Sequence, residues 1–184
     1  MAQGQRLAEA GQAADASAAL GEALGLRRGE PLADFTYAGL FDAERTRLDE
    51  LTLVAIETRA RADLVLGRHG ELAAELETWC RAHPLRERLW ELLILALYRA
   101  GRQAEALRAY TDVRDRLADE HGIDPGPALR DLQTRILARH PSLSPGPDPP
   151  DQTRLRRHRP GQQPCSRRGC ISRGPGAAWC RVRG

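Results

Sequence analysis

An internal repeat is the feature that most constrains how this 184-residue chain can fold. Gly67 recurs as Gly101, 34 residues later, and an arginine follows each of the two glycines. The aligned stretches are GRHGELAAEL at 67–76 and GRQAEALRAY at 101–110, which match Glu71 with Glu105 and Leu76 with Tyr110. A weaker third copy, GQAADASAAL, begins at Gly11. A period of this length predicts supersecondary units that stack on one another.

The repeat length also indicates what each unit contains. Thirty-four residues is the period of tetratricopeptide repeats, in which a turn joins two helices. We interpret Gly11, Gly67 and Gly101 as the residues that follow each first helix, where glycine adopts the left-handed conformation without steric penalty. The second helix can then run back antiparallel to the first. Because neither helix buries its apolar face alone, neighbouring pairs are expected to share one core.

Apolar residues recur with helical spacing along most of the first 140 residues. The predicted buried faces are Leu72, Leu76, Trp79 and Cys80; Leu89, Leu93, Ala96 and Leu97; Ala106, Leu107, Tyr110, Val113 and Leu117; and Leu129, Leu132 and Ile136. The longest candidate helix, 43–66, carries two stripes, namely Leu48, Leu51, Ala55 and Ala62, and Leu53, Ile56, Ala60 and Leu64. A helix that is apolar on two sides is expected to lie between neighbours. No segment alternates with period two, so we predict an all-α, tetratricopeptide-like superhelix of antiparallel helix pairs.

Proline marks the limits of the folded part of the chain. Asp124 is predicted to be the N-cap of the last helix, with Pro125 at its first position, where a missing N–H costs nothing. Pro141 is predicted to stop that helix. The sequence therefore divides into a helical domain, 1–140, and a tail, 141–184. The tail holds eight Pro, six Gly and nine Arg, so it buries too little apolar surface to fold and is expected to be disordered.

Charge is distributed unevenly between these two parts. The chain has a net charge of +3 and the tail carries +7, which leaves −4 on residues 1–140. An acidic domain of this kind is not a DNA-binding surface by charge. The tail contains the basic run RLRRHR at 154–159, which attracts nucleic acid without reading its sequence, although a solvated charge run is the commoner role. We expect no specific DNA binding by this chain alone.

Residues that enzyme chemistry needs are absent or wrongly spaced. The sequence has no lysine and no P-loop, HExxH or GxSxG motif. Cys80 and His83 lie three residues apart, but Cys80 continues an apolar helix face and is expected to be a structural residue. The remaining cysteines do not have the spacing of zinc ligands; they are Cys165, Cys170 and Cys180. We predict no catalytic, cofactor or metal site.

Hydropathy indicates where the chain resides. No apolar run reaches the roughly 18 residues that a membrane-spanning helix needs. The N-terminal stretch MAQGQRLAEAGQ lacks the apolar segment of a signal peptide. We therefore expect a cytoplasmic protein that does not interact with a membrane.

Three stretches together resemble the bacterial transcriptional activator domain of the antibiotic regulatory proteins of actinomycetes. They are EALGLRRGEPLADF at 22–35, the region 44–110 with HPLRERLW and ALYRAGRQAEALRAY, and DEHGIDPGPAL at 119–129. The resemblance covers residues 5–140 and implies a tetratricopeptide-like helical fold and a role in regulating transcription. In that family the domain usually follows an N-terminal winged-helix DNA-binding domain. The resemblance begins at residue 5, so we expect this sequence to be a fragment of a larger regulator that lacks the winged helix.

These observations predict a protein-interaction module of a bacterial transcription regulator. Its expected partner is a protein, such as a sister subunit, an attached DNA-binding or sensor domain, or the transcription machinery. The alternative is a free-standing tetratricopeptide scaffold protein that is unrelated to transcription. A reading frame for a winged helix directly upstream of Met1 would favour the regulator.

Limited digestion with trypsin tests the predicted division at residue 140. Trypsin should remove the tail before it cuts the helical domain, because it cleaves after exposed arginine in disordered segments. Mass spectrometry of the digest should show a stable product that ends near Pro141. A tail that survives as long as the helical domain would contradict the predicted disorder.

Overall fold

The computed structural model describes residues 1–26 and 42–144. These residues form only helices, without a strand, and the predicted all-α fold is confirmed for this part of the chain. The helices are α1 (Ala2–Glu9), α2 (Ala13–Gly25), α3 (Asp42–Val65), α4 (His69–Ala82), α5 (Glu87–Arg99), α6 (Gln103–His121), α7 (Pro127–Leu137) and the 3-10 helix η1 (Pro141–Leu143). The predicted disorder concerns residues that lie almost entirely outside the described ranges.

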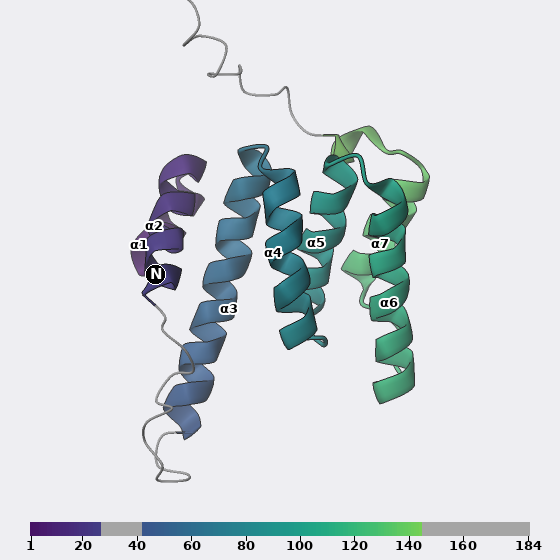
Figure 1. Ribbon diagram of the computed structural model, residues 1–184, viewed down its shortest axis with the longest axis horizontal. Coiled ribbons are helices and arrows are strands. Elements are labelled where there is room, and N and C mark those ends of the chain that lie inside the picture. The colour runs from purple at the N-terminus through teal and green to yellow at the C-terminus, as the bar shows by residue number, and fades with distance from the viewer. Residues whose placement is uncertain (27–41, 145–184) are drawn as a thin grey trace, which may run out of the picture. The chain divides into compact units, whose positions relative to one another are not determined.

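The first six helices form three antiparallel pairs, α1–α2, α3–α4 and α5–α6, and α7 packs against α5 and α6. Figure 1 shows these pairs side by side in chain order, with α7 behind α6. The first helices also contact one another in succession, α1 with α3, α3 with α5, and α5 with α7. One row of helices, α1, α3, α5 and α7, therefore runs through the whole stack.

Each pair turns at a glycine with a left-handed backbone. The φ angle is 75° at Gly11, 78° at Gly67 and 79° at Gly101. The residue after each glycine donates its N–H to a carbonyl five residues earlier: Gln12 to Leu7 at 2.9 Å, Arg68 to Asp63 at 3.1 Å, and Arg102 to Leu97 at 2.9 Å. This Schellman arrangement satisfies carbonyls that a helix end leaves unpaired. The same turn at each pair sends each second helix back along the first.

The second helices present one equivalent repeat position to the core. Leu20, Leu76 and Tyr110 occupy it and are 0%, 0% and 5% exposed. The largest set of buried apolar residues comes from α5, which packs against α3, α4, α6 and α7. Its buried residues are Leu89, Trp90, Leu92, Leu93, Ile94, Ala96 and Leu97. Because a fully buried side chain of this kind contributes about 1.5–3 kcal/mol, α5 holds the neighbouring pairs together.

The two apolar stripes of α3 are buried only in its C-terminal part. Both predicted stripes lie in the core from residue 53 onward, namely Leu53, Ala55, Ile56, Ala60, Ala62 and Leu64. The prediction was wrong for Leu51, which is 40% exposed. The reason is length, since α3 has 24 residues and α4 has 14. In Figure 1 the N-terminal turns of α3 extend past the end of α4.

The last helix begins two residues later than the sequence predicted. The N-cap of α7 is Gly126 and its first residue is Pro127, so Asp124 is not the N-cap and Pro125 is not the first helical residue. A residue before proline is disfavoured in the helical conformation, and Gly126 is extended with φ −60° and ψ 163°. The Gly126 N–H also donates to the Glu87 carboxylate on α5 at 2.7 Å. This bond fixes the start of α7 against α5.

The helical body extends slightly beyond the predicted boundary at residue 140. Leu143 in η1 is 2% exposed and belongs to the same hydrophobic core as α5 and α7. Its carbonyl accepts a hydrogen bond from Nε of Arg99 at 3.2 Å. The prediction that Pro141 stops the last helix was wrong, because α7 already ends at Leu137 and Arg139 has a left-handed backbone with φ 48°. Pro141 instead begins η1.

Replacing Leu93 with Ala should lower the free energy of unfolding by about 2–5 kcal/mol, because it leaves a cavity in the core beside α5. Leu93 is 3% exposed. The matched control is Leu137→Ala on α7, where the leucine is 61% exposed and little burial is lost. Urea unfolding of both variants measures the difference. Equal midpoints would show that α5 does not carry the core.

Candidate protein-interaction surface

Two adjoining cavities open along the row of first helices. The first has a volume of about 550 Å³, lies between α1 and α3, and is lined mostly by small or apolar residues such as Ala8, Ala13 and Ala62. The second has a volume of about 390 Å³ and lies between α3, α5 and α7. Both include Arg61 and Val65 of α3, so they meet on that helix. The row of first helices therefore carries one continuous hollow surface.

The second cavity gathers arginines over an apolar floor, and we call it the arginine groove. Its arginines come from three helices: Arg61 from α3, Arg88 and Arg99 from α5, and Arg135 from α7. The other lining residues are Leu64, Val65, Glu91, Leu92, Leu95, Ala128, Asp131 and Leu132. The groove thus combines four guanidinium groups with two carboxylates.

Three of the four arginines pair with a carboxylate on their own helix. The distances are 3.7 Å from Arg61 to Glu57, 2.6 Å from Arg88 to Glu91, and 2.8 Å from Arg135 to Asp131. The arginine side chains remain 45%, 47% and 38% exposed, whereas the Glu57 side chain is 9% exposed. An exposed pair such as Arg135 with Asp131 contributes about 0–1 kcal/mol. These pairs orient the guanidinium groups but leave them able to bind a ligand.

Arg99 differs from the other three because no carboxylate pairs with it among the described residues. Its Nε donates to the Leu143 carbonyl at 3.2 Å and its Nη1 to the Leu64 carbonyl at 3.4 Å. Burial lowers the pKa of Arg99 from its ordinary value. The pKa of Arg61 is also lowered, first by burial and then by the nearby charge of Arg88. Both lowered pKa values indicate that the charged groups of Arg61 and Arg99 are partly shielded from solvent.

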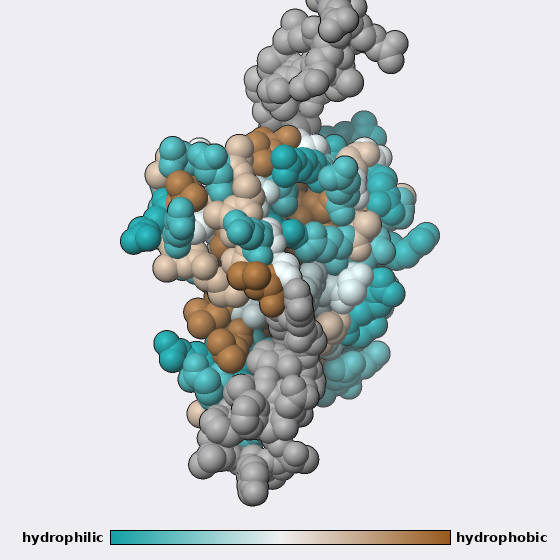
Figure 2. Space-filling view, turned by 60° about the vertical axis from the view of Figure 1, so that its left-hand side comes forward, coloured by the Kyte–Doolittle hydropathy of each residue, from teal (hydrophilic) through white to brown (hydrophobic). Residues whose placement is uncertain are grey.

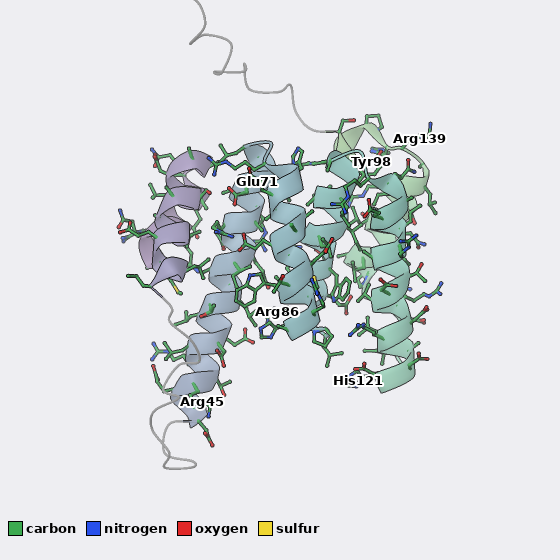
Figure 3. The ribbon with its side chains drawn as sticks, viewed as in Figure 1. Arg45, Glu71, Arg86, Tyr98, His121 and Arg139 are labelled. Carbon is green, nitrogen blue, oxygen red and sulfur yellow. The ribbon has the colours of Figure 1, made fainter. Side chains whose placement is uncertain are left out.

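A second polar network joins α3 to its neighbours and is structural. Arg86 reaches across to Glu57 at 2.8 Å and to Glu50 at 3.1 Å, and these carboxylates raise the pKa of Arg86. Figure 3 shows Arg86 at the opposite end of the helices from Glu71. On the other side of α3, Ser17 of α2 donates to the buried Asp63 carboxylate at 2.6 Å. These contacts orient α3 between the first and third pairs.

Exposed apolar side chains are scattered rather than gathered in one patch. The large ones among the described residues are Met1, Leu26, Leu51, Val65, Leu85, Ile123 and Leu137. On the face seen in Figure 2, hydrophobic residues form separate small patches among hydrophilic ones. Val65 is the member of this set that lines the cavities, and it is 73% exposed. The hollow surface, and not a broad apolar patch, is therefore the best candidate for binding.

The repeat positions singled out from the sequence lie outside this hollow surface, apart from Gly11. Gly67 and Gly101 form turns, Leu76 and Tyr110 are in the core, and the acidic residues are in first turns of second helices. Glu105 pairs there with Arg102, which lowers the pKa of Glu105. Asp124 and Pro125 lie in the loop before α7. These positions shape the fold, and Gly11 also lines the cavity between α1 and α3.

Sequence reasoning missed all four arginines of the groove. They are four among 28 basic residues and share no local motif, because three separate helices supply them. The available signal was positional. Arg88, Glu91, Leu95 and Arg99 are spaced so that they share one side of a single helix. This side of α5 can be identified as exposed only when the buried side of the helix is known.

Cys80 is a core residue and not a nucleophile in this geometry. Its side chain is 1% exposed, and burial, with a smaller contribution from Glu77, raises the pKa of the thiol to about 12. His83 instead stacks on Trp79, with ring centroids 6.0 Å apart. Within residues 1–26 and 42–144, no cluster of His, Cys, Asp and Glu could hold a metal ion. None of the helices in those ranges is long and apolar enough to cross a membrane.

Comparison with known proteins identifies the fold family. Residues 1–137 match the family described as the bacterial transcriptional activator domain. The chain belongs to this family. The match covers every helix of the described part except η1.

Members of this family that resemble the chain are named as regulators. Regulatory protein AfsR of Streptomyces griseus is 47% identical over 151 residues, which are 81% of this chain and 15% of that protein. Regulatory protein DnrI of Streptomyces peucetius is 39% identical over 80% of this chain and 55% of its own length. The chain thus spans about half of DnrI and a smaller part of AfsR.

A solved structure has the same fold. Mycobacterium tuberculosis EmbR in complex with a low affinity phosphopeptide superimposes with a TM-score of 0.72 and 38% sequence identity. The match covers 83% of this chain and 38% of that one. The likeness extends the predicted tetratricopeptide-like arrangement to a relative of known structure.

Alkylation of Cys80 tests its assignment to the core. In a chain with Cys165→Ser, Cys170→Ser and Cys180→Ser, iodoacetamide at pH 8 should label native Cys80 far more slowly than unfolded Cys80. With a pKa of about 12, only about one thiol in ten thousand is ionised at that pH, and the thiolate is the reactive form. Mass spectrometry follows the labelling with and without urea. Rapid labelling of the native chain would instead indicate an activated nucleophile.

Proposed function

We propose that this chain is the protein-interaction part of a bacterial transcription regulator. The observation that carries the proposal is the family match over 137 residues, which coincides with the helical body and its hollow surface. Relatives that share this region are named as regulatory proteins. In this proposal the helical body acts by presenting the hollow surface to a second protein, in the cytoplasm, where bacterial DNA is transcribed.

DNA recognition is assigned in this proposal to a different polypeptide region. Residues 1–140 carry a net charge of −4, which opposes approach to phosphates. The arginines of the groove are partly paired with carboxylates and lie over an apolar floor, which suits a protein segment better than a duplex backbone. The relatives contain substantial sequence outside the region that this chain matches.

The second candidate is a free-standing helical scaffold that assembles proteins outside transcription. The fold alone is compatible with it, because tetratricopeptide-like stacks present extended binding surfaces in many contexts. What favours the regulator is the identity of 39–47% with proteins that are named for regulation. A test must therefore read transcription and not only binding.

A reporter experiment distinguishes these two functions. The full chain is fused to an unrelated DNA-binding domain whose site lies upstream of a weak promoter in an actinomycete host. Reporter output should rise several-fold over the DNA-binding domain alone, because recruitment through the helical body brings a partner to the promoter.

The control is a matched pair of substitutions. Leu76→Asp buries an unpaired charge and should abolish the effect by unfolding the body, whereas Leu137→Asp places the same charge at an exposed position and should preserve it. Output that equals that of the DNA-binding domain alone, or that survives Leu76→Asp, would contradict a role in transcription.

A further inference from the structure

We propose that the arginine groove binds an extended acidic segment of a partner protein, in which carboxylate residues alternate with apolar ones. This inference rests on the proposed function, because it specifies the chemistry of the partner. It also assigns the segment a direction, with its acidic part over α3, α5 and α7 and an uncharged part over α1 and α3.

The charge of the groove is opposite to that of the body that contains it. The groove holds Arg61, Arg88, Arg99 and Arg135 against Glu91 and Asp131, which gives a net charge of +2. Residues 1–140 together carry −4. The positive charge is therefore local to the groove, where it attracts an anionic ligand and discourages a basic one, including the +7 tail of this chain.

Arg99, the last residue of α5, provides donors for such a ligand within the groove. A guanidinium has five N–H groups, and two of those on Arg99 donate to the carbonyls of Leu64 and Leu143. The other three have no partner among the described residues. These two backbone bonds hold the guanidinium in place, so a ligand carboxylate meets a donor set that is already oriented.

Arg61 and Arg88 offer a second position for a carboxylate. Both side chains line the same cavity, and the charge of Arg88 adds to burial in lowering the pKa of Arg61. An anion that bridges them relieves the repulsion between their charges. On α7, Nε of Arg135 is buried without a hydrogen-bond partner in the described part of the chain, and its Nη2 pairs with Asp131.

The floor between the arginines selects for apolar side chains in the same segment. Leu64, Leu92, Leu95 and Leu132 line the cavity, and Val65 is 73% exposed at its edge. Val65 and Arg61 also line the cavity between α1 and α3, whose other charged residue is Glu9. A segment that crosses Val65 therefore leaves the arginines and enters a neutral, small-residue channel. This change in lining sets the direction of the segment.

The test uses the full chain and two matched pairs of arginine substitutions. A fluorescent 14-residue peptide with four Glu alternating with Leu in one half and Ala, Ser and Val in the other is titrated by anisotropy. Arg61→Gln with Arg88→Gln should weaken binding about tenfold, because two exposed charged contacts are lost. Arg108→Gln with Arg116→Gln makes the same charge change in the separate cavity formed by α4, α5 and α6 and should leave binding unchanged.

The tail is present in every protein tested, so its attraction for the peptide cancels in this comparison. A control peptide has Gln in place of each Glu. Its affinity for the parent chain should be no higher than the affinity of the acidic peptide for the Arg61→Gln and Arg88→Gln variant. Peptides with a photo-crosslinker at either end should label α3, α5 or α7 from the acidic end and α1 from the neutral end.

Several results would overturn the proposal. Equal weakening by the two arginine pairs would mean attraction by net charge alone, and crosslinks confined to other helices would place the ligand elsewhere. Loss of a dimer in sedimentation of the groove variant, without peptide binding by the parent chain, would identify a second copy as the occupant. Thermal unfolding confirms that each variant is folded, and the crosslinking of the unsubstituted chain does not depend on any variant.

Failure of this inference and failure of the proposed function give different results. A reporter that is activated by the fused chain, while the acidic peptide does not bind in the groove, retains the function and removes the inference. Peptide binding in the groove without any reporter response retains the inference about the groove and contradicts the role in transcription. When both hold, the Arg61→Gln and Arg88→Gln pair should reduce reporter output and the Arg108→Gln and Arg116→Gln pair should not.

Discussion

The structure depends on the burial of α5 by four neighbouring helices. Each helix of the described residues buries its apolar side against neighbouring helices. The helix α5 contacts α3, α4, α6 and α7, and α3 likewise contacts four helices. The buried residues of α5, from Leu89 to Leu97, determine which residues are left over. The leftover side is Arg88, Glu91, Leu95 and Arg99, and it lines the arginine groove. The same packing that stabilises the stack therefore selects the chemistry of its open surface.

Local sequence was sufficient to predict the elements whose causes are local. The glycine turns are set by conformational freedom at single residues, and Gly11, Gly67 and Gly101 each have φ near 75–79°. The helical spacing of apolar residues likewise predicted the core positions of α4 to α7. The start of α7 was misplaced because two rules competed. Asp124 with Pro125 is a good helix start, but Pro127 keeps Gly126 out of the helical conformation, and Glu87 from another helix caps the later start.

The groove was beyond sequence reasoning because its residues become neighbours only through packing. Arg61 and Arg135 are 74 positions apart and lie on helices that are both covered on one side by α5. A single sequence does not indicate which arginines on different helices come close together, since the pattern around each one is typical of a solvated helix side. The predicted burial of Leu51 was wrong for a related reason. The length of the neighbouring helix determines how much of the apolar stripe on α3 is covered.

The pairing of the arginines bears on how such a groove could discriminate between partners. Arg61, Arg88 and Arg135 already pair with carboxylates of their own helices, so an incoming carboxylate exchanges one ion pair of a solvent-exposed guanidinium for another. Such an exchange changes the free energy by about 1 kcal/mol or less, so charge mainly governs the rate and selectivity of binding. Affinity must come from apolar contact with Leu95 and Val65 and from the donors of Arg99, which has no carboxylate partner to give up. A groove built this way releases its ligand readily and rejects segments that lack either the acidic or the apolar residues.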